Sequence, residues 1–174
     1  KPGNMQGQVF LGAQAEPPRE YVFGARDRCD MTVFRFRTVR DRRYRYIRNF
    51  TPDRPFLQTN NYKEKQYPVW NLIKQLAAED KLTPVQAVLA KPTMPEEELY
   101  DMETDPFQIK NLVSSNKPAD REALERLRDV LEDWIKDTND QGRIPEPPEI
   151  ATAEGATKPQ APGAGKKKKK GKQP

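Results

Sequence analysis

Histidine is absent from this 174-residue chain, and cysteine occurs once, at Cys29. Without histidine, the chain lacks the commonest general base and the commonest transition-metal ligand of proteins. A single cysteine excludes an intrachain disulfide, so cysteine usage does not indicate a redox compartment. Hydrophobic residues make up 34% of the chain, and no apolar run approaches the roughly 20 residues that a membrane-spanning helix needs. We therefore expect a modest core, no membrane span and no histidine-based catalysis within these residues.

The charges are distributed unevenly. The last 17 residues hold seven lysines, so residues 1–157 carry a net charge of −2 although the whole chain carries +5. Residues 26–54 hold ten arginines against four aspartates, whereas residues 96–140 hold 14 acids against six bases. We expect these two segments to pair inside the domain. An arginine-rich surface that binds an anionic polymer is the alternative, because guanidinium groups match sulfate and phosphate oxygens.

Alternating side chains predict β-strands. Tyr21–Phe23 is a short apolar run that ends at Gly24 and indicates a buried strand. Residues 33–50 alternate with a period of two and predict a hairpin, in which aromatic and β-branched residues fit a half-buried sheet. A further strand is expected at Glu98–Met102.

Helical patterns follow the hairpin. After a loop expected over residues 51–67, one helix begins near Pro68, and the Thr83-Pro84 pair opens a second through Leu89. The strongest helix runs from about Pro118 to Asp140, and Gly142 is expected to stop it. Its apolar stripe has spacings of three and four and consists of Leu124, Leu127, Val130, Leu131, Trp134 and Ile135.

These elements predict an α+β fold, a small antiparallel sheet with packed helices, followed by a disordered C-terminal tail. Residues 1–20 lack periodicity and are expected to form an extended lead-in. Residues 21–144 are expected to form the folded unit. Residues 145–174 are rich in proline, alanine, glycine and lysine, and we expect them to be disordered.

Residue patterns alone assign no catalytic residue and no metal ligand. A thiol nucleophile at Cys29 would need an adjacent base, normally histidine, which is absent. A calcium loop of the EF-hand type would need glycine at its sixth position and glutamate at its twelfth. Counted from Asp101, these positions are Pro106 and Leu112. The acids of this region are therefore expected to be solvated turn residues.

The segment Glu98–Leu112 reads Glu-Leu-Tyr-Asp-Met-Glu-Thr-Asp-Pro-Phe-Gln-Ile-Lys-Asn-Leu. It resembles the Leu-Tyr-Asp-Leu…Asp-Pro…Asn-Leu signature that closes the C-terminal subdomain of type I sulfatases. Tyr21–Arg28, Phe36–Asp41 and Arg43–Asn49 also resemble this family, nearest its N-sulfoglucosamine sulfohydrolase-like and choline-sulfatase-like branch. The resemblance extends over about residues 5–150.

The resemblance implies a C-terminal fragment of a sulfatase that hydrolyses sulfate esters or sulfamates of sulfated sugars. It implies an upstream catalytic domain in the same polypeptide, which carries the formylglycine and the calcium-binding residues. Calcium is thus expected in the full-length enzyme, with no ligand identified in this chain. The pocket-lining loop of the family falls at Arg26, Asp27 and Arg28, which are the predicted substrate-binding residues. The implied compartment is periplasmic, extracellular or lysosomal.

A stand-alone module that binds nucleic acid or sulfated glycan remains the alternative. It would use the arginine-rich hairpin and the run Lys166–Lys170, which attracts any polyanion by charge. No RNA-recognition, zinc-finger or helix-turn-helix pattern supports a specific nucleic-acid partner.

Overall fold

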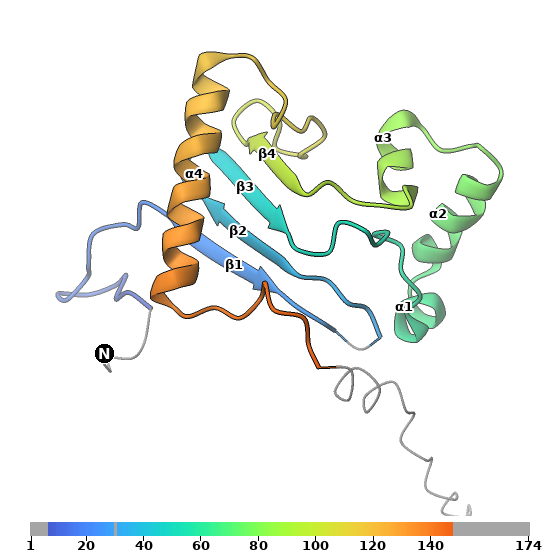
Figure 1. The fold of residues 1–174 in the computed structure, drawn as a ribbon, viewed down its shortest axis with the longest axis horizontal. Coiled ribbons are helices and arrows are strands. Elements are labelled where there is room, and N and C mark those ends of the chain that lie inside the picture. Colours follow the sequence, from blue (N-terminus) through green and yellow to red (C-terminus); the bar gives the residue numbers. More distant parts are fainter. Residues whose placement is uncertain (1–6, 30, 148–174) are drawn as a thin grey trace, which may run out of the picture.

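The computed structural model describes residues 7–29 and 31–147. Its centre is one antiparallel sheet in the order β1-β2-β3-β4, crossed on one face by the long helix α4 (Figure 1). This confirms the predicted α+β fold with a small antiparallel sheet. The predicted disordered tail lies outside the described residues from position 148 onward. The strands are β1 Val22–Arg26, β2 Phe36–Arg40, β3 Tyr44–Asn49 and β4 Glu97–Asp101, and α4 is Pro118–Asp137.

The predicted hairpin is formed by β2 and β3, with Phe36 opposite Asn49 and Arg40 opposite Arg45. Its turn contains neither glycine nor asparagine. Instead, the side chain of Asp41 accepts hydrogen bonds from the amides of Arg43 at 2.8 Å and Tyr44 at 2.5 Å. An aspartate that bonds to the backbone two residues ahead closes a turn without help from glycine.

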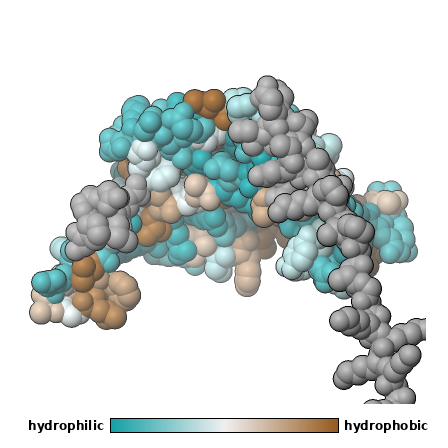
Figure 2. Space-filling model, turned by 90° about the horizontal axis from the view of Figure 1, so that it is seen from below, coloured by the Kyte–Doolittle hydropathy of each residue, from teal (hydrophilic) through white to brown (hydrophobic). Residues whose placement is uncertain are grey.

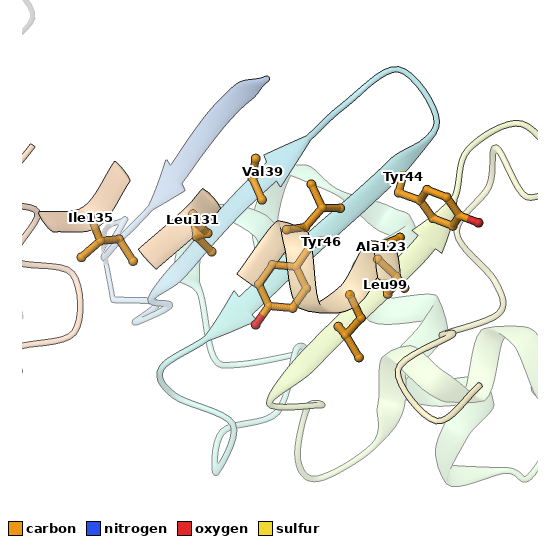
Figure 3. Packing of buried hydrophobic residues seen from close by; sticks show 9 residues of the cluster. Val39, Tyr44, Tyr46, Leu99, Ala123, Leu131 and Ile135 are labelled. Atoms are coloured by element: carbon orange, nitrogen blue, oxygen red, sulfur yellow. The ribbon is translucent and has the colours of Figure 1, made fainter. Parts of the chain in front are cut away.

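The core lies between α4 and the sheet. Because side chains alternate along a strand, Val39, Tyr46 and Leu99 share the face that meets the α4 stripe, as Figure 3 shows. Trp134 is partly buried and stacks on Phe23 of β1, with ring centroids 5.1 Å apart. The stripe predicted for this helix is confirmed. The helix contributes Ala123, Leu124, Leu127, Leu131 and Ile135 to the buried cluster.

The end of α4 differs from the sequence prediction. The helix stops at Asp137, and Asn139 adopts a left-handed φ of 50°. The amide of Asp140 then donates to the carbonyl of Ile135 at 2.9 Å, as in a Schellman motif. The prediction that Gly142 stops the helix is therefore wrong. Asparagine tolerates the left-handed conformation and ends the helix three residues earlier.

The connection from β3 to β4 forms a helical arm, residues 51–96, which Figure 1 shows away from α4. The helices predicted near Pro68 and at Thr83 are confirmed. The loop predicted over residues 51–67 is wrong where α1 forms, because Asn60 caps this short helix by accepting from the amide of Lys63. The arm contains α1 Asn61–Gln66, α2 Pro68–Ala78, α3 Pro84–Ala87 and the 3₁₀ turn η1 Val88–Ala90.

Seen from below, the surface is mostly hydrophilic, and its hydrophobic residues form small separate groups (Figure 2). No helix within the described residues is long and apolar enough to cross a membrane.

Candidate functional site

The structure separates the three predicted substrate-binding residues. Arg26 ends β1 and is exposed on the sheet face away from α4, where its guanidinium carbon lies 4.2 Å from the ring centroid of Phe34. Asp27 and Arg28 line a different hollow of about 380 Å³ on the other side of this strand end. Arg26 and Asp27 are consecutive residues of an extended chain, so their side chains point to opposite faces. The three residues therefore share one loop but do not form one cluster.

Asp27 is engaged by Arg37, whose side chain is 2% exposed. Arg37 donates to the two carboxylate oxygens of Asp27 at 2.9 and 3.1 Å. Its Nε donates to Asp140 at 2.8 Å. A buried guanidinium needs this degree of pairing to offset its lost hydration. Arg37 thereby ties the loop after β1 to the segment after α4.

The segment after α4 returns past the end of β1 (Figure 1). Gly142 lies against Arg37, and a Cβ built there would come within 1.9 Å of a guanidinium nitrogen. Further along, Glu146 accepts from the Nε of Arg28 at 2.7 Å, and the Arg28 side chain is only 8% exposed. The Arg28 side chain is thus largely covered, although it was predicted to bind substrate.

A larger hollow of about 720 Å³, here called the open basin, lies on the sheet face opposite α4. Arg26 and Arg45 line it from the sheet, and the acid among its lining residues is Glu98, which accepts the hydroxyl of Tyr100. Two guanidinium groups against one carboxylate favour an anionic or polar occupant. The remaining wall is largely apolar and comes from Phe36, Ile47, Phe56, Val88, Leu89 and Met94.

Sequence reasoning missed the arm as a wall of this basin. Alternation indicates that Arg45 and Ile47 share a face, but it does not indicate which face a helix covers. Arg45 is held in place, because it donates to Thr38 at 3.3 Å and to Gln108 at 2.9 Å. Gln108 belongs to the Asp-Pro turn after β4 and has a left-handed φ of 57°.

In the segment after β4, the motif residues Asp105 and Asn111 make hydrogen bonds that stabilise the local fold. Asn111 accepts from the amides of Leu99 and Val113, each at 3.1 Å, and donates to the carbonyl of Glu97 at 3.0 Å. Hydrogen bonds from the amides of Lys110 and its neighbours hold the pKa of Asp105 below its ordinary value. These bonds fold the turn back onto the outer edge of the sheet.

The basic and acidic segments pair as predicted. Asp101 accepts from Arg43 at 2.8 Å, and Arg48 donates to Glu96 at 2.6 Å. The hydrogen bond from Arg43 comes first among the causes that lower the pKa of Asp101. The guanidinium groups of the hairpin are therefore largely used inside the domain, which favours internal pairing over an exposed polymer-binding strip.

The described residues contain no group of three or more side chains able to hold a metal ion. The donor set that calcium prefers, several converging oxygens, is thus not present in this part of the chain. Cys29 is exposed, and its amide and carbonyl pair with those of Thr32.

No protein-family profile matches the chain. An ulvan-active sulfatase of Formosa agariphila is 38% identical over 142 residues, which cover 82% of this chain and 23% of that protein. A second ulvan-active sulfatase of the same organism is 32% identical over 146 residues, covering 80% of this chain and 26% of that protein. The solved structure of a 2-O GAG sulfatase superposes on this chain with a TM-score of 0.42 and a sequence identity of 20%. The superposition covers 79% of this chain and 21% of the sulfatase chain.

The predicted resemblance is confirmed: over most of its length the chain is similar to sulfatases, and it matches a sulfatase C-terminal subdomain. It spans about a quarter of the length of the curated relatives it matches. The greater part of each relative therefore lies outside the residues that match this chain.

Proposed function

We propose that this chain is the C-terminal subdomain of an enzyme that hydrolyses sulfate esters or sulfamates of sulfated sugars. The observation that carries the proposal is the 38% identity over 142 residues to an ulvan-active sulfatase. In this proposal residues 1–20 lead in from the catalytic domain, residues 21–144 form the subdomain and residues 145–174 form a tail. The formylglycine and the calcium ligands belong to the catalytic domain, because the described residues here offer no metal-binding cluster. The compartment is periplasmic, extracellular or lysosomal.

The open basin is the part of this chain that lines the substrate pocket. Two features support this assignment: it is hollow, and its charged walls are mainly cationic. Exposed apolar side chains on the arm, such as Leu72 and Val85, give the catalytic domain a surface to pack against. Exposed apolar side chains are the groups that such an interface would bury.

Among the three predicted substrate-binding residues, Arg26 is the one free to meet a sulfate group. It is exposed and makes no ion pair within the described residues. Asp27 and Arg28 act on the substrate indirectly in this proposal. They hold the loop in place through Arg37 and Glu146, so that Arg26 keeps its orientation.

The test uses the longer polypeptide that includes the adjoining catalytic region. We expect it to release sulfate from a sulfated algal polysaccharide, whereas the 174-residue chain releases none even with added calcium. Arg26→Ala should lower kcat/KM by about tenfold or more, the loss of one charged hydrogen bond, without changing the Tm. Arg40→Ala is the matched control, because Arg40 is an exposed arginine at the last position of β2.

Two outcomes would contradict the proposal. One is an adjoining region without a Cys- or Ser-x-Pro-x-Arg motif. The other is equal activity of the Arg26 and Arg40 variants, which would remove Arg26 from the substrate pocket.

A further inference from the structure

Where the sheet meets the helical arm, the cationic side chains of Arg26 and Lys63 each lie over a ring of the same series of aromatic residues. The rings of Phe34, Phe56 and Trp70 follow one another with centroids 6.0 Å apart at each step. Arg26 lies over the first ring at 4.2 Å, and the Nζ of Lys63 lies over the last at 4.3 Å. The row therefore brings together a strand residue and a helix residue that are 37 positions apart in the sequence.

Neither cation has a carboxylate partner within the described residues. This distinguishes them from their neighbours, since Lys74 also approaches Trp70 but donates to Glu64 at 2.8 Å. Cation–π contacts hold a charge in place without neutralising it. The two positive charges at this junction are thus positioned but uncompensated.

The positive charges of Arg26 and Lys63 repel each other. Burial, and then the positive charge of Arg26, lower the pKa of Lys63 below its ordinary value of 10.5, against a smaller opposing contribution from Cys29. A like charge nearby disfavours the protonated form, and an anion between the two groups would reverse this effect. The aromatic surface beneath, with Phe34 fully buried, keeps water from one side and strengthens any charge interaction above it.

We propose that Arg26 and Lys63 together bind one oxyanion, the sulfate or carboxylate group of an acidic sugar. The guanidinium supplies a planar fork to two oxygens, and the ammonium supplies a mobile point charge to the same group. Lys63 thereby becomes a second binding residue, contributed by the arm. Its role in turnover rests on the function proposed above, whereas the binding itself does not.

Trp70 provides a local reporter. Its side chain is 8% exposed, and its indole Nε1 has no hydrogen-bond partner within the described residues. The chain has two tryptophans, and the other, Trp134 of α4, stacks on Phe23 of β1. The two indole resonances therefore report on the proposed site and on a remote position in the same sample.

The experiment is an NMR titration of the complete 174-residue chain with sodium sulfate at constant ionic strength, followed through both indole N–H resonances. We expect a saturable shift of the Trp70 resonance and none of Trp134. Arg26→Met and Lys63→Met should each weaken binding about tenfold, as expected for one charge-assisted hydrogen bond. Lys65→Met, an exposed neighbour on α1, is the matched control and should leave the dissociation constant unchanged.

Parallel titrations with a monosaccharide sulfate ester and with a hexuronate distinguish the two sources of the anion. A saturable shift of the Trp70 resonance with either compound supports the site and identifies which acidic group it binds. An unresponsive Trp70 resonance, or equal affinities in the Met variants and the Lys65 control, would overturn it. If the chain binds the anion but the longer polypeptide is inactive, the sulfatase proposal is rejected and the anion site stands. If the longer polypeptide is active but the chain does not bind the anion, the anion site is rejected and the sulfatase proposal stands.

Discussion

The two faces of the four-stranded sheet differ in what covers them. On one face α4 closes the core, and Val39, Leu99 and Leu127 are each 0% exposed. On the other face the sheet opens into a basin of about 720 Å³ lined by Arg26 and Arg45. Because strand side chains alternate, the same short segments supply both surfaces. The α4 face therefore holds the core, while the opposite face is the one on which we propose that a ligand binds.

The charges follow the same division. Near α4 they are paired: Glu97 accepts from Arg128 and from the hydroxyl of Tyr46, which links β3, β4 and the helix. The hydrogen bonds from Arg128 are the largest cause that lowers the pKa of Glu97. At the basin and the arm, by contrast, Arg26 and Lys63 lack acidic partners within the described residues. Paired charges fix a fold, whereas positioned and uncompensated ones attract a ligand.

The largest change in unfolding free energy is expected from a cavity created in the core between α4 and the sheet. Leu127→Ala should cost about 2–5 kcal/mol of unfolding free energy, as large-to-small changes in a packed core do. Trp134→Ala should cost about 3 kcal/mol, since that ring is only partly buried. Urea denaturation followed by circular dichroism measures both. Ile47→Ala in the basin is the control, and a loss equal to that of Leu127→Ala would contradict the division between the faces.

The next effect concerns the segment that returns from α4. Gly142→Ala should destabilise by about 1–3 kcal/mol, the usual cost of overpacking, because its Cβ would come within 1.9 Å of Arg37. Gly7→Ala is the control, since nothing lies within 4 Å of a Cβ there. Thermal unfolding of the two variants gives the comparison. An unchanged Tm for Gly142→Ala would mean that Arg37 does not hold this segment.

Gly142 also illustrates what sequence can and cannot predict. Local patterns correctly gave the hairpin, β4 and the α4 stripe, because periodicity and turn chemistry are local. The contact between Gly142 and Arg37 joins residues far apart in sequence, so glycine was mistaken for a helix stop. The uncovered sheet face was missed for the same reason. The proposed role of Lys63 was missed as well, because nothing in the sequence marks a lysine whose ammonium lies over a tryptophan seven residues later.

A smaller effect is expected from acid. Burial opposes the charge of Asp140, but hydrogen bonds from Arg37 and the Gly142 amide hold its pKa below the ordinary value of 3.8. A lowered folded-state pKa contributes stability above the unfolded value, and this is lost as pH falls through the folded-state pKa. Asp140→Asn should therefore be less stable than the natural chain at about pH 6, with the difference closing toward about pH 2.

Urea unfolding at a series of pH values measures this difference. Asp133→Asn, an exposed α4 position that pairs with Lys136 at 3.3 Å, is the control and should show a much smaller dependence on pH. A gap for Asp140→Asn that stays constant down to the lowest pH would show that its carboxylate is not engaged by Arg37.

The smallest effect is expected on the exposed surface of the helical arm. Leu72 on α2 is 48% exposed, so Leu72→Ser should change the unfolding free energy of the 174-residue chain by less than about 0.5 kcal/mol, as surface changes do. In the longer polypeptide the same change should lower the Tm, because we propose that the arm packs there against the catalytic domain, and a serine would remove apolar contact. Glu79→Ser, at the exposed end of α2, is the control and should be silent in both proteins. Differential scanning calorimetry of the four samples separates the cases. A loss confined to the longer protein supports the exposed surface of α2 as an interface, whereas an equal loss in both would mean that Leu72 already belongs to the core of this chain.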